Sequence, residues 1–248
     1  MDFTIEELSL NAWPALKTLF YDGWIIRMAN GYSNRANSIN MIYPSRINTK
    51  SIEEKIKYCD DIYARHNLPA NYKILSCEEH KQIEKRLEAL NYEKILETQI
   101  QVCDITKLRI KKHEGIIISG SFDNIWKESV IAFNKIKEEH KSTFKNIMDN
   151  IAVSKIAVRK EAGGATVACG YGVLENNYAG LFSIVVKKEE RGKGYGREIT
   201  EAILCEAARR GIEKSYLQVD HDNSAALRLY ETLGYKEVYR YWYRIAKL

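Results

Sequence analysis

The chain has 248 residues, of which 45% are hydrophobic and 29% are charged, and this length favours two domains. No apolar run approaches the roughly 20 residues that a membrane-spanning helix needs, and the start MDFTIEELSL is acidic where a secretory signal is basic, so we expect a cytoplasmic protein that does not contact a membrane. The formal net charge is +5 without a dense Lys/Arg block, so we do not expect nucleic acid as the primary partner.

The first part of the chain alternates helical and strand patterns. A helix over residues 13–20 is predicted to end at Asp22-Gly23, and a hairpin with a turn at Asn30-Gly31 follows it. The later elements of this part are predicted as strands at 24–28, 38–43, 72–75 and 92–104 and helices at 52–66 and 78–90.

The second part begins near residue 105 and is richer in strands. Its central feature is the loop RGKGYG, which opens a helix that ends at Gly211. The other elements are predicted as strands at 116–118, 151–159, 165–174, 178–186, 215–220 and 235–245 and helices at 123–139, 142–149 and 224–233.

The two parts contain a weak repeat. LEALNYEKILETQIQV at 87–102 is similar to YETLGYKEVYRYWYRI at 230–245, and a helix, a short strand and a second helix lie before each copy. Chance could explain the local match, but the common element order favours a tandem of related folds, with domains at 1–104 and 105–248. Because the stretch between residues 43 and 52 lacks glycine, we expect the first copy to have lost a ligand function.

The loop after the strand at 178–186 has the chemistry of a phosphate site. Glycines let backbone approach an anion closely, and the unpaired N–H groups of a first helical turn point at it. Arg191 and Lys193 add positive charge, and residues 106–248 carry 25 Lys/Arg against 18 Asp/Glu. A tight connection without function is the structural alternative. The patterns of P-loop NTPases and of dinucleotide-binding folds are both absent.

Metal and thiol chemistry have little support in the sequence. The histidines are dispersed, and the cysteines form no CxxC pair. We therefore expect no metal cofactor and buried free thiols in a reducing compartment. The cysteines are Cys59, Cys77, Cys103, Cys169 and Cys205.

Two motifs carry a family resemblance. Arg191-x-x-Gly194-x-Gly196 resembles the [RQ]-x-x-G-x-[GA] pyrophosphate loop of the GNAT (GCN5-related N-acetyltransferase) superfamily. Residues 217–235 are similar to its second motif, in which Asn, Ala, Leu-Tyr and Gly-Tyr recur at the spacings found here. The first part resembles the amino-terminal segment of a subgroup with two GNAT-like halves. The resemblance implies a mixed α/β fold (α+β, mixed sheet), a tandem of GNAT-like halves with a degenerate amino-terminal half.

The resemblance also implies how acetyl-CoA is bound as co-substrate. The strand that ends at Val186 is expected to splay from the strand at 215–220, so that the pantetheine arm pairs with the freed backbone. Asn223 would hydrogen-bond this arm, and Tyr230 would protonate the departing thiolate, although a packed tyrosine is the alternative. The cofactor-binding residues are then Ile184, Val185, Val186, Arg191, Gly192, Lys193, Gly194, Tyr195, Gly196 and Asn223.

The general base is less well defined. An amine acceptor must lose a proton before it attacks, but Gln218 stands where some relatives carry a glutamate. Glu175 is the candidate that we select, with Asp220, His221 or a water chain as alternatives. Glu175 falls in an expected turn, where a solvated side chain is the simpler interpretation.

These patterns together predict an N-acetyltransferase that transfers acetyl directly from acetyl-CoA to a small-molecule or peptide amine. A non-catalytic acyl-CoA sensor is the alternative, and a homodimer is compatible with the sequence. Arg35 and Asn37, beside the first hairpin, could bind an acceptor carboxylate or stabilise a solvated turn. The acceptor and the acyl length stay open.

Overall fold

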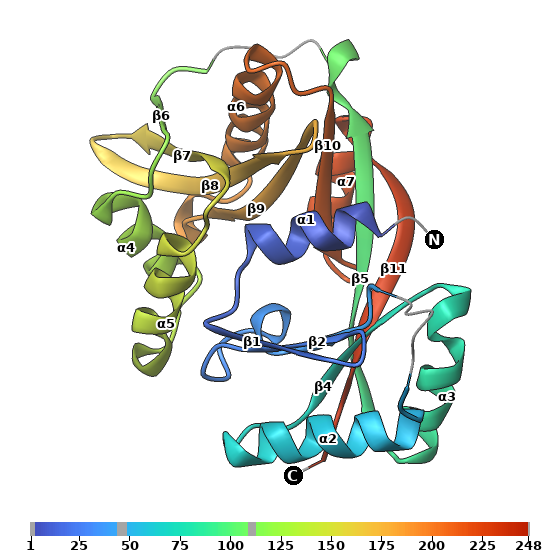
Figure 1. The fold of residues 1–248 in the computed structure, drawn as a ribbon. Helices are drawn as coiled ribbons and strands as arrows, with labels where there is room; N and C mark the ends of the chain where they lie inside the picture. Colours follow the sequence, from blue (N-terminus) through green and yellow to red (C-terminus); the bar gives the residue numbers. More distant parts are fainter. Residues whose placement is uncertain (1–2, 44–48, 109–112, 248) are drawn as a thin grey trace. The chain divides into compact units, whose positions relative to one another are not determined.

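The computed structural model describes residues 3–43, 49–108 and 113–247 (Figure 1). The chain forms two compact units. Unit 1 comprises Met1–Gln99 and Tyr239–Leu248, and unit 2 comprises Ile100–Val238. Two long strands, β5 (Glu93–Asp104) and β11 (Lys236–Ile245), therefore each contribute residues to both units.

Unit 1 contains three helices and four shorter strands among the residues that the structure describes. They are α1 (Thr4–Ala12), β1 (Lys17–Tyr21), β2 (Trp24–Met28), β3 (Ile39–Asn40), α2 (Ile52–Arg65), β4 (Asn71–Leu75) and α3 (Lys81–Ala89).

The helix predicted over residues 13–20 is wrong. The helix lies earlier, at α1, and β1 pairs antiparallel with β2 from Lys17↔Met28 to Tyr21↔Trp24. Asp22 and Gly23 have φ values of 43° and 85°, as the two central residues of a type I′ hairpin turn require. The Asp-Gly pair is therefore a hairpin turn and not a helix stop.

The strands of unit 1 form a mixed arrangement around an aromatic core. β2 pairs antiparallel with β3, β3 parallel with β4, and β4 antiparallel with β11. Tyr63 of α2 and Tyr72 of β4 are fully buried, and Tyr72 donates to the Ile56 carbonyl and to Asp60. Tyr241 and Tyr243 of β11 are buried as well, so this part of the strand is core.

Unit 2 contains four helices and five further strands among its described residues. They are β6 (Ile116–Ser119), α4 (Asn124–Phe133), α5 (Glu138–Asp149), β7 (Ser154–Ala162), β8 (Ala165–Glu175), β9 (Tyr178–Val186), α6 (Tyr195–Arg209), β10 (Lys214–Asp220) and α7 (Ser224–Thr232).

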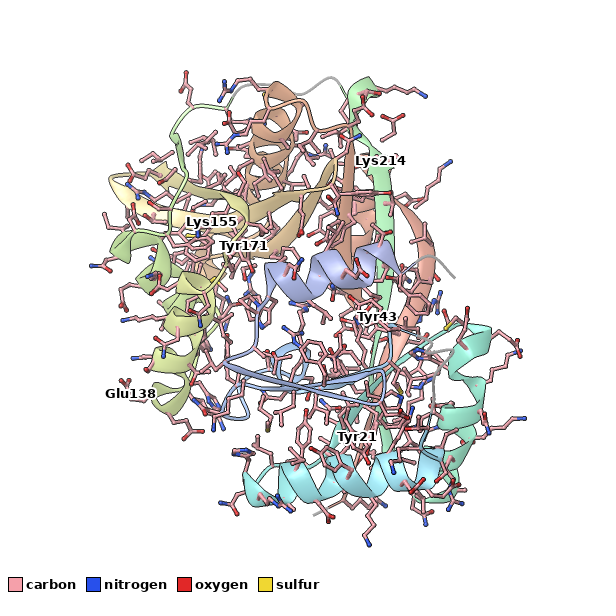
Figure 2. All side chains as sticks on the ribbon, viewed as in Figure 1. Tyr21, Tyr43, Glu138, Lys155, Tyr171 and Lys214 are labelled. Carbon is pink, nitrogen blue, oxygen red and sulfur yellow. The ribbon has the colours of Figure 1, made fainter. Side chains whose placement is uncertain are left out.

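The sheet of unit 2 is mixed. β6, β7, β8 and β9 pair antiparallel in sequence order, whereas β10 pairs parallel with β9. Tyr171 of β8, labelled in Figure 2, is fully buried and its ring packs against Phe122, Trp126 and Phe182 at centroid distances of 5.2, 5.7 and 5.4 Å. This aromatic cluster fixes α4 against β8 and β9.

Helix α6 lies close against the sheet because β8 has glycines beneath it. A Cβ added at Gly170 would lie 2.6 Å from Ile199 Cγ2, and one added at Gly172 would lie 2.5 Å from Ile203 Cγ2. Ile203 is a fully buried residue of α6. Any side chain at these glycines would displace the helix, and with it the loop that precedes it.

The predicted mixed α/β fold is confirmed by these elements. The proposed domains at 1–104 and 105–248 differ from the compact units at both ends, because β5 and β11 are each divided between the units. The assignment of a degenerate first domain and a ligand-binding second domain stays a prediction.

Candidate functional site

The RGKGYG loop forms an open backbone turn at the start of α6. Gly192 and Gly194 have φ values of 82° and 87°, a region that favours glycine, and Gly194 is the residue that precedes the helix. A Cβ at either glycine would meet no atom within 4 Å, so the space beside them is open. The N–H groups of the first turn of this 15-residue helix face that space.

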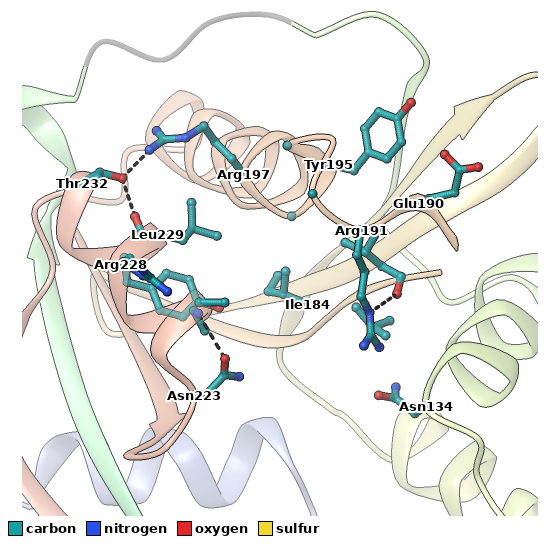
Figure 3. Close-up of a pocket in the computed structure, with 18 residues that line it drawn as sticks. Asn134, Ile184, Glu190, Arg191, Tyr195, Arg197, Asn223, Arg228, Leu229 and Thr232 are labelled. Atoms are coloured by element: carbon teal, nitrogen blue, oxygen red, sulfur yellow. Dashed lines mark hydrogen bonds between the residues drawn. The ribbon is translucent and has the colours of Figure 1, made fainter. Parts of the chain in front are cut away.

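A cavity of about 720 Å³ lies at this helix start (Figure 3). The end of β9, the loop, the first turn of α6 and one face of α7 line it. Lys193 is the predicted cofactor residue that does not line it, since its ammonium pairs with Glu190 at 2.8 Å, which raises the pKa of Lys193. The predicted residues that the cavity brings together are Ile184, Val185, Val186, Arg191, Gly192, Gly194, Tyr195, Gly196, Asn223 and Tyr230.

The gap between β9 and β10 opens toward this cavity. Their parallel pairing runs from Lys214↔Tyr178 to Leu217↔Leu181 and stops there. Against β8, the register shifts between Cys169↔Val185 and Tyr171↔Phe182, so β9 carries one extra residue. Ser183, at this bulge, has a φ of 49°. The bulge turns the last residues of β9 away from the ladder and leaves backbone available to a ligand.

Asn223 links the cavity to the start of α7. Its Oδ1 accepts a hydrogen bond from Ala226 N at 3.1 Å, which caps the helix. The amide nitrogen of the same side chain stays able to donate toward the cavity. The sequence motif therefore has a structural role as well as the predicted ligand contact.

Tyr230 forms part of the cavity wall. Its side chain is 8% exposed, its ring packs edge-on against Tyr235 at 5.7 Å, and burial raises the pKa of Tyr230 to about 12. The phenol is therefore protonated at neutral pH. A protonated phenol in the cavity wall can donate a proton or a hydrogen bond to a bound group.

Several cavity residues were missed by the sequence analysis. Arg197, Arg228 and Thr232 lie on α6 and α7, and Asn134 follows the end of α4. Arginine side chains on helices are usually exposed to solvent, so the presence of an arginine there did not indicate a binding site. Their positions become informative only when the packing of α7 beside α6 is known.

The candidates for the general base lie outside the cavity. Glu175 pairs with Tyr178 at the start of β9, and Ile184 lies six positions further on, about 20 Å along the strand. Asp220 accepts from Asp222 N in the turn after β10. Neither these carboxylates nor Gln218 and His221 line the described cavity. The structure thus does not bring Glu175 to the predicted donor site.

Asn37 has a structural role in unit 1. Its Oδ1 accepts from Ala29 N and Gly31 N, and its Nδ2 donates to the carbonyls of Tyr32 and Ser33. The side chain is 6% exposed, so its hydrogen-bonding capacity is used inside the loop. The guanidinium of the nearby Arg35 lies over the Trp13 ring at 5.4 Å.

Two features are absent from the residues that the structure describes. No group of three or more His, Cys, Asp and Glu side chains lies close enough to hold a metal ion. None of the described helices combines the length and apolarity that crossing a membrane requires.

Comparison with known proteins identifies relatives across the whole chain. The family described as "Probable histone acetyltransferase Rv0428c C-terminal" matches residues 4–244. The N-acetyltransferase YobR of Bacillus subtilis, itself uncharacterized, is 24% identical over 247 residues, which is 98% of each chain. The mycothiol acetyltransferase of Thermobispora bispora is 46% identical over 55 residues, 22% of this chain and 19% of that protein.

Solved structures share the fold. A GCN5-related N-acetyltransferase from Kribbella flavida superposes with a TM-score of 0.69 at 11% identity, over 98% of this chain and 95% of that one. A tandem GNAT protein from the clavulanic acid biosynthesis pathway gives a TM-score of 0.64 at 13% identity, over 85% and 76%. The family match spans nearly the full length of the chain. The chain therefore belongs to this acetyltransferase family, within the GCN5-related N-acetyltransferase superfamily.

Proposed function

We propose that this protein transfers the acetyl group of acetyl-CoA directly to the amine of a small molecule or peptide. The observation that carries the proposal is the junction of three features in one cavity of unit 2. These are the glycine loop at the start of α6, the opened edge of β9 and the phenol of Tyr230. Membership in an acetyltransferase family supports the reaction class.

The cavity suits the parts of acetyl-CoA. The N–H groups at the start of α6 favour a pyrophosphate, because the helix terminus is electropositive. Val185 and Val186 offer apolar surface and strand backbone to a pantetheine arm, and the Asn223 amide lies opposite. The gap beside β9 would then receive the arm as an added strand.

The reaction needs no covalent enzyme intermediate. The acceptor amine attacks the thioester carbonyl carbon, a C–N bond forms and the C–S bond breaks. The departing sulfur takes a proton, and Tyr230, which lines the cavity, would supply it. The nitrogen loses its proton to a base. Glu175, Asp220 and His221 do not line the described cavity, and Glu190, which does, pairs with Lys193. We therefore propose that water carries this proton away from the site.

A panel of amine acceptors tests the proposal. Release of free CoA would be measured with a thiol reagent, and a no-acceptor blank would remove the signal of the protein's own thiols, above all the exposed Cys205. Acceptor-dependent CoA release, matched by acetylated product in mass spectrometry, is the expected result. Saturable binding of acetyl-CoA without turnover on any amine would instead identify an acyl-CoA sensor.

A further inference from the structure

We infer that Arg197 and Arg228 form a second anion site at the edge of the cavity, and that it holds the 3′-phosphate of coenzyme A. The inference rests on the proposed donor. It assigns a role to two cationic side chains that lie outside the glycine loop and outside the recognised motif positions.

The two arginines come from different helices but reach the same edge. Leu229 Cδ2 lies 3.9 Å from the Cβ position of Gly196, which places α7 beside the first turn of α6. Arg197 Nη2 donates to Thr232 Oγ1 across these helices. Thr232 follows Arg228 by four residues, so both lie on one face of α7. Figure 3 shows this group on the side of the cavity opposite Arg191.

Arg197 is held in place by a built network. Its Nη1 donates to Glu201 Oε1 at 3.0 Å, while Glu201 Oε2 lies 2.6 Å from His113 Nε2. Glu201 is only 9% exposed, so the carboxylate is fixed. With Thr232 as its second partner, the guanidinium of Arg197 is oriented before any ligand arrives. A preoriented planar fork suits bidentate contact with a phosphate.

Arg228 leaves uncompensated positive charge at the same edge. Its Nε donates to the Ser224 carbonyl at 3.2 Å, and the described residues supply no acidic partner for it. Glu201 pairs with Arg197 and offsets the charge of that guanidinium. The pair retains a net positive charge that a phosphate can neutralise.

The ligand must then carry two separate anionic groups. The N–H groups of the helix start and Arg191 form the first site, and the arginine pair on the other side forms the second. Coenzyme A meets this requirement, because its ribose 3′-phosphate is distinct from its pyrophosphate. 3′-Dephospho-CoA and pantetheine carried on a protein lack that group. The geometry therefore points to a free acyl-CoA as the donor.

Competitive binding of CoA and 3′-dephospho-CoA to the full chain tests this site. The wild type should prefer CoA by about ten- to hundredfold, as a charge-assisted phosphate contact implies. R228Q should lower this preference, and the double variant R197Q/R228Q should bring it close to one, mainly by weakening CoA. Arg209 lies on α6, as Arg197 does, but it pairs with Glu206 and does not line the cavity. R209Q should therefore keep the wild-type preference.

The outcomes separate this inference from the proposed donor. Equal affinity of the wild type for both nucleotides, or a preference that persists in the double variant, would overturn the 3′-phosphate site alone. If neither nucleotide binds, the donor assignment fails and the site fails with it. R197Q breaks the contacts to Glu201 and Thr232, whereas R228Q removes one contact to a carbonyl. R228Q therefore decides the question if R197Q does not fold.

Discussion

At the scale of single residues, Tyr230 lies in the cavity wall with its phenol protonated. Y230F keeps the ring packing against Tyr235 and removes only the hydroxyl. We expect kcat to fall by about 10²–10⁴-fold, the usual contribution of a positioned proton donor, with acetyl-CoA affinity near wild type. Steady-state kinetics and calorimetry would measure the two effects. A loss below about threefold would show that the thiolate leaves without this group, or that chemistry is not rate-limiting.

The raised pKa of Tyr230 makes a separate prediction about pH. Burial raises this pKa to about 12, so the neutral phenol persists above pH 10 and is lost only as pH approaches 12. The ratio of kcat between wild type and Y230F should therefore stay constant from pH 7 to 10. A ratio that declines toward one with a midpoint at or below pH 10 would contradict this assignment.

Gly194 tests the anion site through its backbone. G194A places a methyl group where no protein atom lies within 4 Å, so its effect on a bound pyrophosphate is separable from a clash with the fold. Gly211 is a matched control, because its φ of 83° and its open surroundings are similar and it lies away from the cavity. Calorimetry should show CoA binding at least tenfold weaker in G194A than in G211A. Equal affinities would mean that the loop does not hold the ligand.

At the scale of elements, the β9 bulge depends on an unusual residue conformation. Ser183 has a φ of 49°, which a β-branched residue adopts only with strain. S183V should lower the free energy of unfolding by about 1–2 kcal/mol, whereas S183G should preserve it. Denaturant unfolding of both variants measures the difference. Similar stabilities would indicate that the bulge rearranges freely.

The elements also show what the sequence could predict. The glycine loop, the two flanking helices and the order of strands in unit 2 were predicted because glycine spacing and hydrophobic periodicity are local properties. The helix at 13–20 was wrong because Asp22-Gly23 ends a helix and makes a hairpin turn equally well, and only the pairing of β1 with β2 decides between them. Arg197 and Arg228 were not predicted, since their place in one cavity depends on how α6 and α7 pack.

At the scale of the whole molecule, the two units are expected to differ in ligand capacity. Calorimetry on the intact chain should report one acetyl-CoA per polypeptide, because the glycine loop precedes α6 and has no glycine-containing counterpart before α2. Two equivalent sites would show that the first unit kept its function. G194A should weaken this single binding event and reveal no second, tighter one.

The division of β5 and β11 has a consequence for how this protein can change in evolution. Cys103 Sγ contacts the Leu233 carbonyl and Ile105 N donates to the Glu213 carbonyl, so the end of β5 belongs with unit 2. The end of β11, in contrast, pairs with β4 in the other unit. A single cut at residue 104 would leave the first fragment without β11, which pairs with β4. The second fragment would lack β5. Because unit 1 is formed from both ends of the chain, no single cut separates the two units, and they are expected to be inherited together.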